Sequence, residues 1–135
     1  MKQTGKDPSD LKTMIADYME NGFLDNIIDM FKHDMSLCSC TGNLITDERT
    51  RVRIGTVALF ETLKSEVPKK VSEALPYILP VLKNRNPVYR GDAAYLLGII
   101  GDPAAIPFLE EATKDGDAHV RTIAREAIEQ IESGD

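Results

Sequence analysis

Leu75-Pro76-Tyr77-Ile78 returns 31 residues later as Ile106-Pro107-Phe108-Leu109, and this repetition decides the fold. The same offset relates Lys83 to Lys114, Asn84 to Asp115, Asn86 to Asp117, Arg90 to Arg121 and Ala93 to Ala124. A register kept over so many positions indicates one supersecondary unit used twice, with each copy burying its apolar side against the next. Stacked units of this kind present an extended surface, so the repeat favours a binding scaffold.

Composition places the chain among globular helical proteins. Of its 135 residues, 42% are hydrophobic and 28% are charged, which is typical of a chain that forms a packed core. Strand signals are poor, because only 6% of the residues are aromatic and alternating apolar runs are absent. We therefore predict an all-α fold.

The charge balance bears on the kind of partner. The net charge is −6, and the one basic stretch, residues 47–84, has seven Lys or Arg against five Asp or Glu. An acidic protein repels a phosphate backbone, so we expect no nucleic-acid partner. The first residues lack the apolar segment of a signal peptide, and no apolar stretch approaches the roughly 20 residues that cross a bilayer. We expect a cytoplasmic protein that does not contact a membrane.

Helix starts are marked by three pairs in which Asp or Asn precedes proline: Asp7-Pro8, Asn86-Pro87 and Asp102-Pro103. The side chain can cap the first turn, and proline at the first helical position loses only a donor that had no partner. Apolar spacing then predicts about seven helices, over residues 8–20, 23–33, 46–65, 68–83, 87–99, 103–114 and 118–132. Pro76 and Pro80 are expected to bend the fourth of these helices.

A family resemblance appears in the stretch from Asn86 to Leu109. Its successive motifs are Tyr89-Arg90, Ala93-Ala94, Leu97-Gly98, Gly101-Asp102-Pro103 and Ile106-Pro107. This order resembles a HEAT repeat, and it is closest to the short kind named after phycobilisome lyases. Val120-Arg121 and Val52-Arg53 match the openings of the next and the previous repeat.

The resemblance implies an α-α superhelix, a HEAT-like solenoid of about three and a half repeats. Residues 8–132 form a single helical repeat domain after a flexible N-terminus at 1–7. Within that domain we expect a degenerate first helix pair at 8–34, an irregular connection at 35–46, repeats at 47–84 and 85–116, and a terminal half-repeat at 117–132.

The resemblance also implies that the second helix of each pair lines a concave face. Second helices are expected at about 22–34, 69–83 and 103–114. The candidate protein-binding residues on that face are Lys69, Lys70, Glu73, Tyr77, Glu110, Glu111 and Lys114. Tyrosine often anchors interfaces. Tyr77 has Phe108 as its repeat-mate, however, so a core position is an equal alternative.

Arg53, Arg90 and Arg121 recur at the start of the first helices and could form a basic binding stripe. The resemblance favours a structural role instead, in a hydrogen-bonded ladder with acidic or carbonyl groups between turns. Asn84 and Asp115 are the candidate partners.

His33, Cys38 and Cys40 are the only local set with metal-ligand chemistry. Zinc sites usually need four protein ligands, or three and a water, so the signal is weak and we expect reduced thiols without metal. No phosphate-binding loop and no nucleophile beside a base is evident. His119 is expected at the surface, and neither catalytic residues nor a cofactor are predicted.

The leading interpretation is a non-enzymatic scaffold that recognises an unidentified protein through the concave face of its second helices. Two alternatives stay open. One is an accessory subunit similar to phycobilin lyases that acts on a chromophore protein, and the other is a metal or redox sensor centred on Cys38 and Cys40.

Overall fold

The computed structural model describes residues 8–134, and in that part of the chain all regular structure is helical. The α-helices are α1 (Pro8–Glu20), α2 (Leu24–His33), α3 (Thr41–Leu44), α4 (Thr50–Glu66), α5 (Leu75–Ile78), α6 (Pro87–Ile100), α7 (Ile106–Ala112) and α8 (Ala118–Glu132). The 3-10 helices are η1 (Met35–Cys40), η2 (Val71–Ala74), η3 (Leu79–Lys83) and η4 (Pro103–Ala105). The predicted all-α superhelix is confirmed. The expected flexible segment 1–7 lies outside the described residues.

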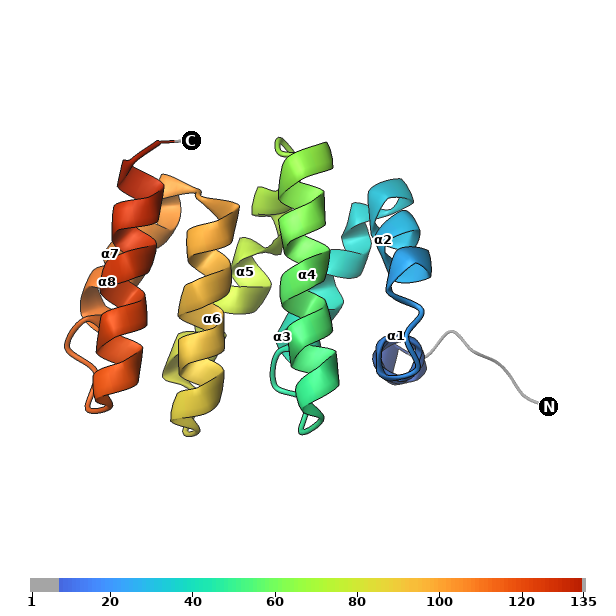
Figure 1. Ribbon diagram of the computed structural model, residues 1–135, viewed down its shortest axis with the longest axis horizontal. Coiled ribbons are helices and arrows are strands. Elements are labelled where there is room, and N and C mark those ends of the chain that lie inside the picture. Colours follow the sequence, from blue (N-terminus) through green and yellow to red (C-terminus); the bar gives the residue numbers. More distant parts are fainter. Residues whose placement is uncertain (1–7, 135) are drawn as a thin grey trace.

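The helices form two layers. In the first layer α2, α4, α6 and α8 stand in a row, and each contacts the next (Figure 1). The second layer lies behind it and consists of η1–α3, η2–α5–η3 and η4–α7, which also contact one another in that order. Helix α1 is seen end-on beside this stack and packs against α4 and α2.

The segment 35–46 corrects the sequence analysis, because most of it is helical rather than irregular. Asp34 starts η1 by accepting a hydrogen bond from the backbone N–H of Ser36 at 3.1 Å. The buried side chains of η1 and α3 are Met35, Leu37, Cys38, Cys40, Thr41 and Leu44. A 3-10 helix of six residues followed by a single α turn of four has no steady 3.6-residue period, so apolar spacing does not reveal it.

This segment also changes the place of α2. The second-layer helix before α4 is η1–α3, since η1 contacts η2 and α3 contacts α5. Helix α2 instead contacts α4 in the first layer. The prediction of a second helix at 22–34 is therefore wrong, and the first helix pair consists of α2 with η1–α3.

The expected caps at the Asx-Pro pairs are confirmed where the structure describes them. Asn86 Oδ1 accepts from the N–H of Val88, and Asp102 Oδ1 accepts from the N–H of Ala104, both at 2.9 Å. Gly101 ends α6 with φ of 76°, a left-handed conformation that glycine adopts without steric cost. Asp7 lies outside the described residues.

Prolines break the second layer into short pieces, so the single bent helix expected over 68–83 is instead η2, α5 and η3. Pro76 stands in the first turn of α5 and Pro80 in the first turn of η3. Proline has no N–H to donate to the preceding turn, so a straight α-helix cannot continue through both positions. The second layer is consequently more irregular than the first.

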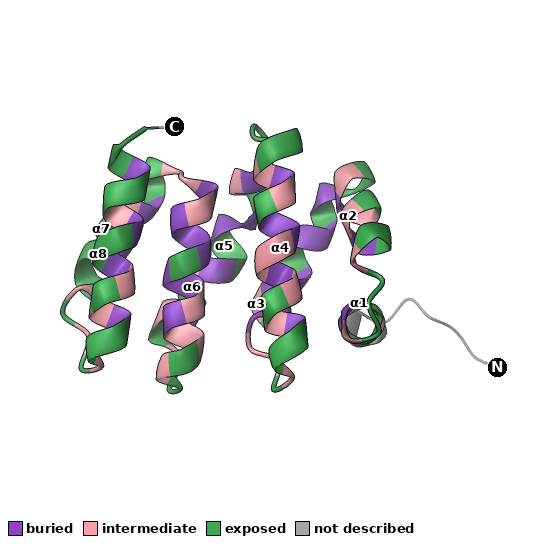
Figure 2. Cartoon of the chain, viewed as in Figure 1, coloured by how far each residue is buried: buried purple, intermediate pink, exposed green. Residues whose placement is uncertain are grey.

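The core fills the space between the layers and between neighbouring first-layer helices. Leu97 is fully buried on α6. At Gly98 an added Cβ would lie 3.1 Å from Ala127, so α6 and α8 approach closely at that point. Figure 2 shows buried residues running through both layers, with exposed residues along the outer sides of α4, α6 and α8.

Candidate protein-binding surface

All seven residues proposed for the concave face are exposed and belong to the second layer or its adjoining turns. We call them the second-layer surface. Lys69 and Lys70 precede η2, and Glu73 lies within it. Tyr77 is on α5, while Glu110, Glu111 and Lys114 lie on α7 and the turn after it.

The two aromatic repeat-mates are on the surface. Tyr77 is 43% exposed and Phe108 is 46% exposed, whereas their neighbours Ile78 and Leu109 are fully buried. Neither aromatic ring therefore belongs to the core, so the core alternative for Tyr77 is wrong and its binding role stays a prediction. Each of the two complete repeats after α3 thus presents one aromatic side chain at the same position of its second helix.

An ion pair links the second helices of these repeats. Lys83 Nζ on η3 lies 2.8 Å from Glu111 Oε1 on α7, and both side chains are largely exposed. The hydrogen bond from Lys83 holds the pKa of Glu111 below its ordinary value. An exposed pair of this kind adds little to stability. The pair does, however, hold the predicted surface residue Glu111 against Lys83. Lys83 was not among the predicted residues, although it is the repeat-mate of Lys114.

A hollow of about 180 Å³ lies between η3 and α7 and was missed by sequence reasoning. Its lining combines apolar and charged residues: Leu79, Leu82, Lys83, Phe108, Glu111, Ala112 and Asp115. The lining residues come from two segments about 30 positions apart. Their juxtaposition depends on how far apart the two short helices stand, which the sequence does not specify.

The arginine series forms the expected ladder at the turns between repeats. Arg90 Nη1 donates to the carbonyl oxygen of Asn84 at 2.8 Å, so it caps the end of η3. Its Nε and Nη2 donate to the two carboxylate oxygens of Asp115 at 2.8 and 2.9 Å. This bidentate contact lowers the pKa of Asp115. Both predicted partners, Asn84 and Asp115, therefore contact the ladder.

The other two arginines repeat the contact. Arg53 Nη1 donates to the carbonyl oxygen of Asp47 at 2.9 Å, and Arg121 Nη1 to that of Asp115 at 2.7 Å. Arg53 Nε also lies 3.2 Å from a carboxylate oxygen of Asp92, whose pKa is nevertheless raised by burial. In each repeat the guanidinium group ties the end of a second helix to the start of the next first helix. These contacts support the structural interpretation of the series.

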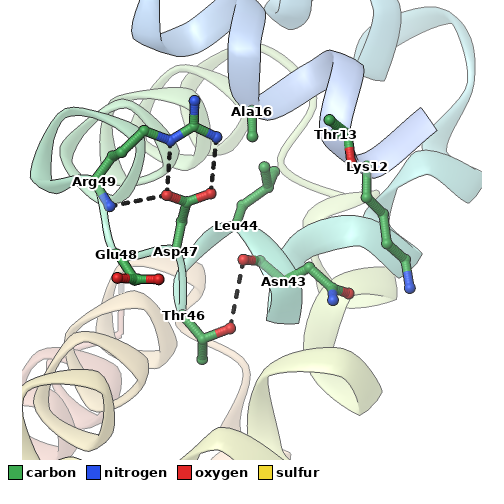
Figure 3. Close-up of a pocket in the computed structure, with 9 residues that line it drawn as sticks. All are labelled: Lys12, Thr13, Ala16, Asn43, Leu44, Thr46, Asp47, Glu48 and Arg49. Carbon is green, nitrogen blue, oxygen red and sulfur yellow. Dashed lines mark hydrogen bonds and ion pairs between the residues drawn. The ribbon is translucent and has the colours of Figure 1, made fainter. Parts of the chain in front are cut away.

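A polar pocket of about 710 Å³ lies between α1 and the turn before α4 (Figure 3). Arg49 Nε and Nη2 donate to Asp47 at 3.0 and 3.1 Å, and Arg49 Nη1 donates to Asp17 of α1 at 2.9 Å. The pocket is lined by Asp47 and Arg49 together with Lys12, Thr13, Ala16, Asn43, Leu44, Thr46 and Glu48. The contact of Arg49 with Asp17 attaches α1 to the repeats, and its sequence separation of 32 residues hid it from motif analysis.

The weak metal candidates do not form a ligand set. Cys38 and Cys40 are buried free thiols, and burial raises the pKa of Cys38 to about 12 and raises that of Cys40 as well. Metal binding and nucleophilic attack both need the thiolate. His33 is exposed, with Nδ1 2.8 Å from the carbonyl oxygen of Asp29. Among the side chains that the structure describes, residues 11–134, no three His, Cys, Asp or Glu are arranged to hold a metal ion.

His119 is exposed at the start of α8, as expected. None of the helices that the structure describes is long and apolar enough to span a membrane.

Comparison with known proteins identifies the repeat. Residues 42–129, more than half of the chain, match the family model for HEAT repeats. The matched region begins within α3 and includes all three arginines of the ladder as well as Tyr77 and Phe108. A search of curated proteins found no match to the chain.

Proposed function

The chain belongs to the HEAT-repeat family, whose members commonly act as scaffolds for protein interactions, and on that premise we propose that it binds a protein through its second-layer surface. It is the surface that the family resemblance implies to be the concave side of the superhelix.

One observation carries the proposal: Tyr77 and Phe108 are exposed at the same position of consecutive repeats. Large aromatic side chains are favoured at the centres of interfaces, because they bury much area at low entropic cost. Proline precedes each of them, and Pro76 and Pro107 are exposed as well. Proline fixes the local backbone, so the two aromatic residues stand on a surface that needs little ordering on binding.

The charges around these aromatic residues suit recognition of a protein segment. Lys69 and Lys70 make no ion pair within the part of the chain that the structure describes, while Glu73 and Glu110 add the opposite sign. Mixed charges at an interface rim affect partner choice and association rate more than affinity. A complementary pattern on the partner would set the orientation in which it docks.

We also propose that the chain has no catalytic activity and no resident cofactor. The thiol groups of Cys38 and Cys40 are buried and protonated at neutral pH, which does not support the sensor alternative. Absorbance and metal analysis of the purified chain test both alternatives. Bound chromophore would favour the lyase-like role, and stoichiometric metal would favour the sensor.

Affinity capture from a native lysate with the wild-type chain and two variants tests the binding surface. One variant combines Tyr77→Ala with Phe108→Ala, and the other carries Tyr95→Ala alone. Tyr95 is a matched control, because it is 47% exposed but lies on α6 in the first layer. We expect the double variant to lose the captured partner and the Tyr95 variant to keep it. The opposite result would place the interface on the first layer.

A further inference from the structure

We propose that the hollow between η3 and α7 receives one uncharged apolar side chain, of the size of leucine or phenylalanine, from a peptide segment of the partner. This inference rests on the proposed function and deepens it, since it states what kind of partner segment the second-layer surface accepts.

The volume of the hollow limits the occupant to one side chain. It measures about 180 Å³. An apolar cavity of about 150 Å³ in another protein holds a benzene molecule, so the space is sufficient for a leucine or phenylalanine side chain. Leu79 and Leu82 of η3 face it from one side, and Phe108 and Ala112 of α7 from the other. An entering apolar group therefore finds apolar walls on both helices.

The charged residues around the hollow already have partners. Glu111 is paired with Lys83 at 2.8 Å, and Asp115 is held by Arg90 at 2.8 Å. A charged side chain that entered the hollow would lose hydration without gaining a free counter-charge, which is unfavourable. Charge complementarity consequently favours a neutral occupant.

The hollow distinguishes this junction from the preceding one in the same layer. Where α3 meets α5, an added Cβ on Gly42 would lie 2.8 Å from the carbonyl oxygen of Tyr77, so the two backbones leave no room there. The junction of η3 with α7 is open beside Phe108, one of the two exposed aromatic residues. The anchor side chain thus enters next to a ring that can cover it, as at the centre of an interface.

Four capped amino acids serve as probes of the hollow: the N-acetyl amides of leucine, phenylalanine, glutamate and lysine. Each is added to the ¹⁵N-labelled full chain, and backbone amide shifts are followed by NMR. We expect the leucine and phenylalanine derivatives to shift the amides of Leu82, Phe108 and Ala112 saturably. The glutamate and lysine derivatives should shift them at least about tenfold less at equal concentration, because a charged group pays the desolvation cost.

Two variants and one control connect these shifts to the hollow. Ala112→Met extends a side chain into the space and should abolish the saturable shifts, whereas Ala104→Met, at an exposed position of η4, should leave them unchanged. If Ala112→Met does not fold, Phe108→Ala, which removes one wall at an exposed position, replaces it and should weaken binding at least about fivefold.

Shifts of equal size for charged and apolar probes, or apolar-probe shifts that persist in Ala112→Met, would overturn the inference. The capture experiment distinguishes a failure of the anchor site from a failure of the proposed binding surface. A captured partner that is lost with Tyr77→Ala but kept with Ala112→Met contradicts only the anchor site. A captured partner that is lost with Tyr95→Ala and kept with Tyr77→Ala contradicts the second-layer interface, whatever the probes show.

Discussion

The two layers use the same repeat register in different ways. In the first layer α4, α6 and α8 are uninterrupted helices of 14 to 17 residues that bury residues of their inner faces and hold the arginine ladder. The second layer consists of pieces of three to seven residues, interrupted by proline, in which each of the last two repeats exposes an aromatic ring. From this difference we propose that each repeat assigns stability mainly to its first helix and recognition mainly to its second. The predictions below test this division.

The largest effect is expected in the first-layer core. Replacing Leu97 by Ala should lower the free energy of unfolding by about 2–5 kcal/mol, because it removes buried apolar contacts and leaves a cavity. Urea denaturation measures the change. Tyr95→Ala on the same helix is the control and should cost less than about 1 kcal/mol, since its side chain is half exposed. Equal losses in the two variants would show that α6 does not bury the face assigned to it.

The second-largest loss of stability is expected in the arginine ladder. Arg90→Ala should lower the free energy of unfolding by about 1–3 kcal/mol, because it removes both guanidinium donors from the mostly buried carboxylate of Asp115 and the donor to the carbonyl oxygen of Asn84. Arg90→Lys should recover only part of this loss, since lysine cannot make the bidentate contact. Full recovery by lysine would indicate that charge alone matters at this position.

The ion pair of Arg90 with Asp115 should make the free energy of unfolding depend on pH. Arg90 holds the pKa of Asp115 below its ordinary value of 3.8 in the folded chain. The stabilisation by Asp115 is therefore complete above pH values near 3.8 and is lost as the pH falls through the lowered folded-state value. The stability difference between the wild-type chain and Arg90→Ala should be constant from pH 7 to about pH 5 and shrink below about pH 4. A difference that grows on acidification would contradict this assignment.

The smallest effect on stability is expected for the second-layer aromatic residues. Tyr77→Ala and Phe108→Ala should each change the free energy of unfolding by less than about 1 kcal/mol, because both rings are nearly half exposed. Thermal unfolding of the two single variants checks this. A loss comparable to that of Leu97→Ala would mean that these rings are structural, and the division between the layers would fail.

Much of this architecture could be predicted from the sequence, because the 31-residue register specifies both spacing and chemistry. The caps at Asn86 and Asp102, the burial of Leu97 and the contact of Arg90 with Asn84 follow from residues close to one another in the repeat. The helical nature of 35–44 could not be predicted in this way, because its short 3-10 and α turns have no long apolar period.

The candidate site was predictable in part. The register placed Tyr77 and Phe108 at equivalent positions but left their burial undecided, since apolar residues occur on both sides of these short helices. The hollow beside Phe108 and the pair of Lys83 with Glu111 depend on the separation of η3 and α7. That separation results from three-dimensional packing, which residue spacing does not encode.

Amide hydrogen–deuterium exchange of the full chain, with and without its captured partner, tests the central claim most directly. The account predicts that the partner slows exchange mainly over residues 71–83 and 103–112, with little change in α4, α6 and α8. Protection confined to α4, α6 and α8, with none over the second layer, would contradict it.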